Sequence, residues 1–170
     1  MKVWPFHRSR ADEDAEGLLL AVTQASRRPE FFGEGKVADT LEGRFELMTL
    51  NAGLALLRLR AEPGAEPLAQ AFTDKLFRLF DAGLREAGTG DTAVPKRMTK
   101  MAGAFYGRLE AYAVALGDQA ALEAALARNV WGAASHPFAP ALARYFSGVA
   151  ARQASAPISA MFSAEAWPSA

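Results

Sequence analysis

A stretch of four basic residues with no acid among them is the part of this sequence best suited to bind another molecule. Between Asp91 and Glu110 the chain carries no carboxylate, but it does carry Lys96, Arg97, Lys100 and Arg108. Elsewhere the charges are mixed, and the whole chain balances 19 Lys and Arg against 19 Asp and Glu. Clustered cations attract carboxylates and phosphates. The segment therefore predicts contact with an acidic or phosphate-bearing partner.

The spacing of these cations places all four on one side of a helix. At about 100° per residue they fall within an arc of about 120°, with Ala104 and Gly107 between them. Apolar side chains fill the opposite arc, which we assign to the core. Two interpretations remain open. The basic arc is either the solvated face of a bundle helix or a docking face, where small residues would let a partner approach closely.

A glycine-rich turn precedes this helix. Gly88 and Gly90 permit backbone conformations that other residues resist. Asp91 or Thr92 can cap the helix, with Pro95 in its first turn. The stretch GTGDTAVPK matches neither the dinucleotide-binding nor the phosphate-loop spacing, and we predict no strand before it. We interpret the turn as a shaped connector rather than a nucleotide site.

Residues typical of catalysis or metal binding are sparse. The chain has no Cys, which excludes disulfides, thiolate nucleophiles and Cys-ligated metals. Neither His7 nor His136 has a second ligand at helical spacing, and no Ser/His/Asp arrangement has supporting context. Met98 and Met101, the conceivable haem ligands, fall on the predicted core arc. We therefore expect no enzyme, no metal and no cofactor.

Length and composition indicate one folded domain. The 170 residues are 51% apolar, enough to bury a core. A net charge of zero argues against DNA binding along the surface. The sequence contains no run of 18 apolar residues, so we expect no membrane span. We expect neither a secretory signal nor an organellar presequence. The expected location is the cytoplasm, with peripheral contact to the cytoplasmic face of the inner membrane as an option.

Apolar residues recur at three- and four-residue spacing, which favours helix nearly everywhere. We predict an all-α, single-domain bundle of about six helices, at residues 13–28, 41–60, 67–87, 94–116, 119–131 and 140–152. The helix at 41–60 is apolar nearly all round, so it should be the buried centre. Thr40 or Asp39 is placed to cap it, and Asp118 to cap the fifth helix. Residues 1–12 and the Ala/Ser/Pro-rich tail 153–170 are expected to be flexible, frayed ends of a helical domain at 13–152.

Two adjacent aromatic residues, Phe31 and Phe32, lie in a Gly-rich loop after the first helix. Both cannot easily point inward. One can plug the bundle, while the other can form part of an exposed apolar patch, which on a folded domain often marks a binding site.

Three blocks of the sequence resemble the signature of the ubiquinol–cytochrome c chaperone family, whose members assist assembly of complex III. The first, residues 81–112, carries LRE, the turn GTGD, the basic helix start PKRMTK and FYGR. The second, ASRRPEFFGEGKVADTLEGRFELMTL, carries RRPEF, DT and GRF. A weaker Arg-Asn element lies in ALARNVWG. Together the blocks span about residues 25–132.

The resemblance implies a non-enzymatic chaperone that binds newly made cytochrome b and supports its assembly into complex III. Mitochondrial members also associate with the ribosome near the tunnel exit and act with a small partner protein; this chain looks like a bacterial relative. Arg44 and Arg85 can instead form internal ion pairs that fix loops, and we favour that role for Arg44. The residues expected to bind a partner are Lys96, Arg97, Lys100, Arg108, Arg85, Asp91, Tyr106, Phe31 and Phe32.

Two further functions remain as alternatives. The basic face of the 94–116 helix could bind RNA or the ribosome surface, which steep salt dependence would reveal. A helical enzyme acting on a lipid or quinone-like substrate would instead need a deep apolar cavity lined with convergent polar groups.

Overall fold

A computed structural model describes residues 9–169, so the N-terminal residues 1–8 of the predicted flexible end lie outside it. The described chain forms an all-α bundle without named strands, which confirms the predicted fold class. The six α-helices are α1 (Arg10–Ser26), α2 (Leu41–Arg60), α3 (Glu66–Glu86), α4 (Val94–Ala115), α5 (Gln119–Trp131) and α6 (Ala139–Ala154). Three short 3₁₀ turns are η1 (Pro29–Phe31), η2 (Ile158–Phe162) and η3 (Ala164–Ala166).

Side-chain caps explain several of the helix ends. Thr40, one of the two caps considered for α2, accepts a hydrogen bond from the Gly43 amide at 3.1 Å. Asp118 accepts one from the Ala121 amide at 3.0 Å, as predicted. Ser9 caps α1 by accepting from the Asp12 amide at 3.2 Å. Because of that cap α1 begins at Arg10, inside the segment that we predicted to be flexible.

Helix α2 is the centre of the molecule, as its apolar sequence predicted. It contacts every other α-helix, and Leu47, Leu50 and Ala55 are completely buried. One buried polar group on α2 links three helices. The Asn51 side chain donates to Ser26 of α1 at 3.2 Å and accepts from the Tyr145 hydroxyl of α6 at 2.7 Å. Such satisfied buried groups fix the relative positions of the helices.

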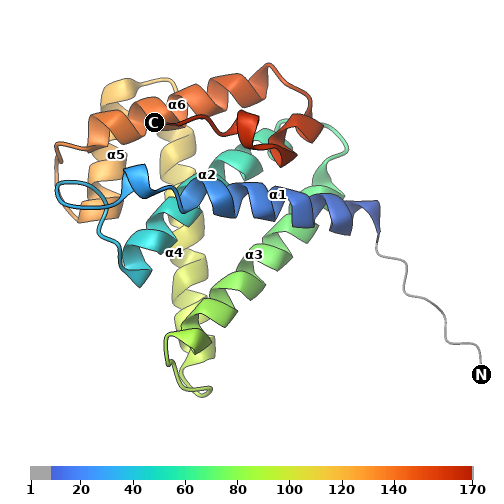
Figure 1. Ribbon diagram of the computed structural model, residues 1–170, viewed down its shortest axis with the longest axis horizontal. Helices are drawn as coiled ribbons and strands as arrows, with labels where there is room; N and C mark the ends of the chain where they lie inside the picture. The colour runs from blue at the N-terminus through green and yellow to red at the C-terminus, as the bar shows by residue number, and fades with distance from the viewer. Residues whose placement is uncertain (1–8, 170) are drawn as a thin grey trace, which may run out of the picture.

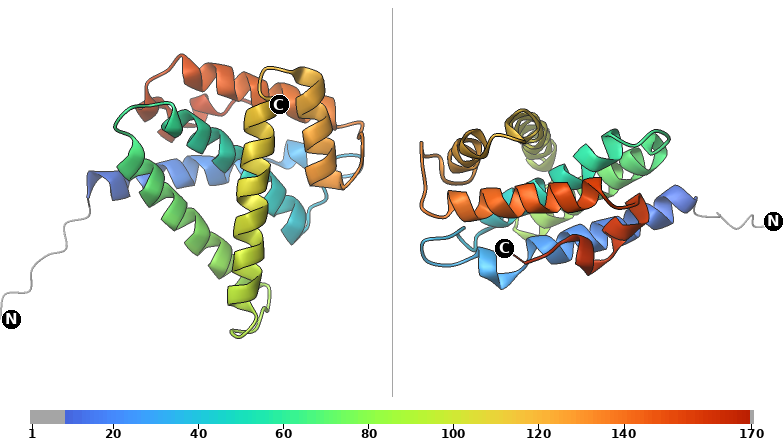
Figure 2. Two further views of the ribbon diagram at one scale, coloured as in Figure 1. Left: turned by 180° about the vertical axis from the view of Figure 1, so that it is seen from behind. Right: turned by 90° about the horizontal axis from the view of Figure 1, so that it is seen from above.

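The other helices pack around α2 (Figure 1). Helices α1 and α3 lie together near their N-terminal ends and diverge toward their C-terminal ends, with α2 behind the space between them. The C-terminal end of α3 and the start of α4 project from the body as a hairpin. Figure 2 shows α1 and the C-terminal segment on one side of the molecule, with α4 and α5 on the other.

The C-terminal segment differs from the predicted flexible tail. Met161 and Trp167 are each only 1% exposed, and the Trp167 indole donates to the Met161 carbonyl at 2.9 Å. The Arg28 guanidinium donates to the carbonyls of Trp167 and Pro168. Apolar side chains in an otherwise small-residue tail thus bury themselves against the bundle, since that removes apolar surface from water.

Candidate functional site

The basic end of α4, defined here as Lys96, Arg97 and Lys100, lies on the projecting α3–α4 hairpin. All three residues are exposed. Arg97 donates to the Thr89 hydroxyl at 2.9 Å. Lys96 and Lys100 form no side-chain hydrogen bond or ion pair with the described part of the chain. Three of the four cations predicted from the sequence are therefore gathered at one end of the helix and accessible.

Arg108, the fourth predicted cation, turns inward instead. Its guanidinium forms two hydrogen bonds of 2.6 Å with the Glu46 carboxylate of α2, and its side chain is only 20% exposed. The physical reason is that Glu46 is itself buried and needs a counter-charge, because an unpaired buried charge is costly. The helical angle of Arg108 was consistent with the basic arc, but the position of the neighbouring helix decides its role. Arg108 is therefore not part of an exposed docking face.

The Glu46–Arg108 pair also contacts the aromatic side chain of Phe45. The guanidinium carbon of Arg108 lies 5.7 Å from the centre of the Phe45 ring, and Phe45 packs on Phe80 with ring centres 5.2 Å apart. Burial raises the pKa of the Glu46 carboxyl, while the hydrogen bonds and charge of Arg108 offset part of that rise. The pair thus helps to position the Phe45 ring through the contact with the Arg108 guanidinium.

Arg85 and Asp91 stabilise the turn between α3 and α4. Arg85 donates to Asp81 at 2.7 Å, one turn earlier on α3, and also pairs with Asp91 across the turn. Gly88 adopts the left-handed conformation with φ of 83°, which the tight reversal requires. We predicted that Asp91 or Thr92 would cap α4. That was wrong, because α4 starts after Ala93 without a side-chain cap and Asp91 is engaged with Arg85.

The three predicted aromatic contacts have different surroundings. Phe31 is completely buried and meets the Tyr145 ring edge-on, with centres 4.9 Å apart, so it plugs the bundle and cannot contact a partner. Phe32 is partly buried and packs against the core. Tyr106 is 44% exposed and stacks on Phe77, with centres 6.0 Å apart. Of the two residues considered for an exposed apolar patch, Phe31 is therefore excluded, and Phe32 is only partly exposed.

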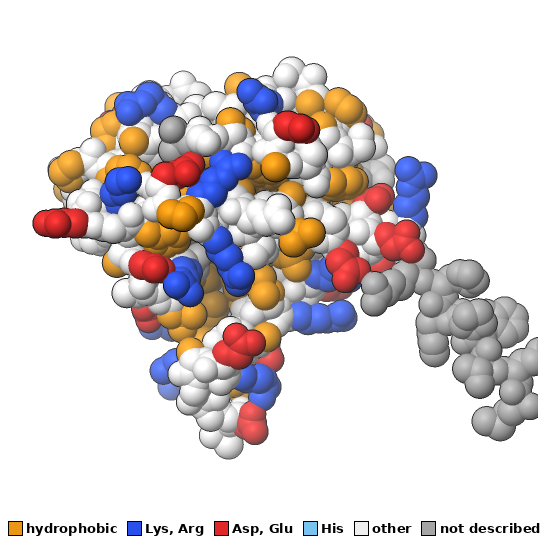
Figure 3. All heavy atoms as spheres, in the orientation of Figure 1, with side chains coloured by type: hydrophobic (Ala, Val, Ile, Leu, Met, Phe, Trp, Pro, Cys, Tyr) orange, Lys and Arg blue, Asp and Glu red, His pale blue; other side chains and the backbone are white. Residues whose placement is uncertain are grey.

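A concave feature lies elsewhere, between the diverging ends of α1 and α3. This open, largely apolar α1–α3 groove has a volume of about 390 Å³. Its lining residues are Thr23, Ser26, Arg27, Leu41, Arg44, Phe45, Met48, Leu79, Phe80, Ala82, Gly83, Leu84, Glu86, Ala87 and Met101. In Figure 3, apolar side chains are visible on the face between α1 and the hairpin, with charged groups around them.

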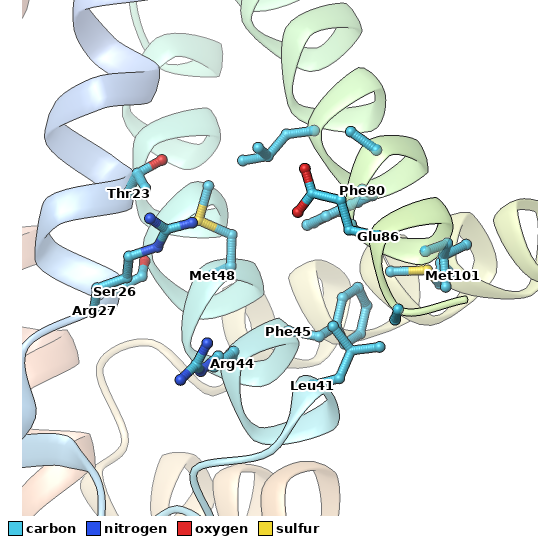
Figure 4. A pocket seen from close by; sticks show the side chains of 15 residues that line it. Thr23, Ser26, Arg27, Leu41, Arg44, Phe45, Met48, Phe80, Glu86 and Met101 are labelled. Carbon is cyan, nitrogen blue, oxygen red and sulfur yellow. The ribbon is translucent and has the colours of Figure 1, made fainter. Parts of the chain in front are cut away.

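Charged side chains stand at the edges of the α1–α3 groove (Figure 4). Arg27 lies on the α1 side and Glu86 on the α3 side. Neither side chain has a hydrogen bond or ion pair with another described residue. Arg44 is paired with Asp39 at 2.7 Å, as we had favoured, and this pairing lowers the pKa of Asp39.

Sequence reasoning missed the groove, although α2 contained a signal for it. Leu41, Phe45 and Met48 are spaced by four and three residues, so they share one face of α2. Because α2 is apolar on nearly all sides, we expected the other helices to cover it completely. The structure shows instead that α1 and α3 diverge over this face, leaving Leu41 44% exposed.

The α1–α3 groove contains no arrangement typical of catalysis among its lining residues. It has no His, and the Ser26 hydroxyl donates a hydrogen bond to the Val22 carbonyl at 2.7 Å.

The two histidines lie outside the groove or outside the described residues. His136 is stacked on Trp131 with ring centres 3.9 Å apart, while His7 lies outside the described residues. Across residues 9–169, no group of three or more potential metal ligands occurs. None of the helices in that range has the length and hydropathy needed for a membrane span.

Comparison with known proteins identifies the family of this fold. The family model described as ubiquinol-cytochrome C chaperone matches residues 34–167. The structure is similar to the crystal structure of the Cbp3 homolog from Brucella abortus, with a TM-score of 0.80 and 36% sequence identity. That similarity covers 92% of this chain and 89% of the Brucella chain. Comparison with curated proteins finds no match.

Proposed function

Because the chain belongs to the ubiquinol–cytochrome c chaperone family, we propose that it is a non-enzymatic assembly chaperone for complex III. In this proposal it binds newly made cytochrome b and holds it for assembly into ubiquinol–cytochrome c reductase. It works without a cofactor and without chemical turnover. We further propose that it acts in the cytoplasm and meets its client at the inner face of the membrane.

The observation that supports this proposal most directly is the open apolar groove on a firmly packed bundle. A membrane protein before assembly exposes apolar helix surfaces that would aggregate in water, and large exposed apolar features on a folded protein often mark where another protein binds. Leu41 is exposed and Phe45 is partly buried, so both present apolar surface to the groove, while the lining side chains of Met48 and Met101 can adapt to side chains of different shape. The groove can therefore cover a client surface without reacting with it.

The basic end of α4 provides a second contact in the proposal. Lys96 and Lys100 are exposed and unpaired within the described chain, so they can meet acidic groups of the client or of an assembly partner. The same observation favours one alternative function, binding to RNA or to the ribosome surface near the tunnel exit. Binding to RNA would weaken steeply as salt is raised, because each phosphate contact releases counterions.

A deletion and complementation experiment tests the proposed function. The gene is removed from the native host, and cytochrome b abundance and complex III activity are measured. We expect both to fall together and to return when the wild-type chain is supplied, while another respiratory complex serves as the unaffected control. Normal complex III in the deletion strain would contradict the proposal.

A further inference from the structure

The α1–α3 groove is open and largely apolar, and it is bounded by helices. Its walls are the last turn of α1 and the last two turns of α3, its floor is the N-terminal half of α2, and Met101 of α4 lies at one side. Leu41, Phe45 and Met48 run along the floor at helical spacing. Amphipathic helices bind in such grooves by placing apolar side chains from successive turns into them.

The charges at the edges of the groove define what kind of helix would fit. The unpaired Arg27 stands on the α1 wall and the unpaired Glu86 on the α3 wall, on opposite sides of the apolar floor. Arg44 is neutralised by Asp39 and contributes little net charge. A ligand with the same charge on both flanks would therefore meet one favourable and one unfavourable wall.

We propose that the α1–α3 groove binds an amphipathic helix of the client, with an acidic residue on the flank beside Arg27 and a basic residue on the flank beside Glu86. The apolar stripe of this helix lies on Leu41, Phe45 and Met48. This proposal rests on the proposed chaperone function and adds the binding site and the chemistry of the bound segment.

Synthetic helices test the proposed charge pattern. Three peptides of about 18 residues, or five helical turns, share one leucine stripe. The first carries Glu on one flank and Lys on the other, the second Glu on both flanks, and the third Lys on both. Binding to the full chain is measured by fluorescence anisotropy. We expect the mixed peptide to bind about threefold to tenfold more tightly than either uniform one.

Variants of the two walls provide a sharper test with the mixed peptide. Arg27→Glu and Glu86→Lys should each weaken binding by a similar factor. The double variant should restore it, because a helix laid in the opposite direction exchanges its two flanks. Equal binding of all three peptides, or additive losses in the double variant, would overturn the proposed charge pattern.

Two exposed leucines, one in the groove and one outside it, allow a matched test of the apolar floor. Leu41 lies in the groove and is 44% exposed, whereas Leu20 on α1 is 59% exposed and is not a lining residue. Leu41→Glu should weaken binding of the mixed peptide by about tenfold, since it puts a charge into the apolar contact, and Leu20→Glu should leave it unchanged. Equal effects of the two substitutions would overturn the groove as the site.

Photo-crosslinking in the native host separates failure of the groove from failure of the proposed function. A photoreactive residue is placed at position 41 or, as the control, at position 20 of the full chain. We expect cytochrome b to cross-link at position 41 through an amphipathic segment, identified by mass spectrometry. If cytochrome b co-purifies but cross-links only at position 20 or not at all, the groove is not the site although the chaperone function stands. If cytochrome b does not co-purify, the proposed function itself is wrong.

Discussion

At the scale of single residues, the buried Glu46–Arg108 pair shows that a cation on the predicted basic face can have a structural role. Both hydrogen bonds between them measure 2.6 Å, and the Glu46 side chain is 9% exposed. The pair joins α2 to α4 and stands behind Phe45 of the groove. Its role is therefore to stabilise the fold and to position the groove floor.

Removing Arg108 should destabilise the protein strongly. Arg108→Ala leaves the Glu46 carboxylate buried without its partner, and breaking a buried pair in this way costs about 3 kcal/mol of unfolding free energy. Lys100→Ala is the matched control, since Lys100 is exposed on the same helix, and it should stay within about 0.5 kcal/mol. Urea denaturation measures both. Similar stability of the two variants would show that Arg108 is not held inside as described.

The raised pKa of Glu46 predicts a pH dependence of stability. A carboxyl whose pKa is higher in the folded than in the unfolded protein takes up its proton more readily when folded. Its contribution to the unfolding free energy therefore falls as pH rises from the unfolded value, about 4.5, through the raised folded value. Relative to Glu46→Gln, the wild-type protein should gain stability as pH is lowered from 7 toward 4.5. Urea denaturation across that range measures the difference, and a loss of relative stability would contradict the assignment.

Gly43 is a residue whose small size the fold requires. A Cβ atom at this position would lie 1.9 Å from the Ala38 carbonyl oxygen, so the loop before α2 would have to move. We expect Gly43→Ala to destabilise the protein by about 1–3 kcal/mol. Gly103→Ala is the control, because that helical glycine has nothing within 4 Å, and it should raise stability by about 0.5–1 kcal/mol. Thermal unfolding of the two variants should shift in opposite directions.

At the scale of elements, the positions of the helices in the sequence were predicted well, but the contacts and angles between helices were not. Helix ends are set by local chemistry, such as the Thr40 and Asp118 caps and the glycine turn at Gly88, which a sequence shows directly. The inward turn of Arg108 depends on where another helix lies. The groove depends on two helices diverging, and no local pattern reports an angle between helices.

The C-terminal segment was misjudged for a related reason. Its few apolar residues, including Met161 and Trp167, follow no helical or strand period, so composition alone suggested a flexible tail. Burial of Met161 and Trp167 and a pair of hydrogen bonds from Arg28 attach it to the bundle. An isolated anchor of this kind becomes visible only when the surface that receives it is known.

Trp167 should therefore anchor the end of the chain to the bundle. Trp167→Ala removes a side chain that is 1% exposed, and such truncations cost about 3–5 kcal/mol. Deletion of residues 169 and 170 is the control, because Ser169 is exposed. Limited proteolysis and thermal unfolding should show a loosened C-terminus only in the Trp167 variant. Equal behaviour of the two variants would contradict the role of Trp167 as the anchor.

At the scale of the whole molecule, the protein offers two accessible features on a firmly packed body, the apolar α1–α3 groove and the basic end of α4. Family membership supports a role in complex III assembly, and the two features supply apolar and electrostatic contacts for a protein client. The groove would provide most of the binding energy. The cations would contribute orientation and a faster encounter.

Reversing charge at the basic end of α4 should weaken partner binding without unfolding the protein. Lys96 and Arg97 are exposed, so Lys96→Glu combined with Arg97→Glu should change stability by no more than about 1 kcal/mol. Recovery of the partner in co-purification should fall several-fold. The matched control is reversal of Arg78, an exposed residue on α3. Unchanged recovery with a folded double variant would remove the basic end of α4 from the binding surface.

The central claim is that this protein holds newly made cytochrome b. It is tested most directly by pulse-labelling the native host, solubilising its membranes and purifying the tagged chain at successive times. We predict that labelled cytochrome b is the leading specific partner at the earliest times and leaves the chain as complex III accumulates. If ribosomal proteins or RNA dominate instead, and labelled cytochrome b is absent at every time, the account is contradicted.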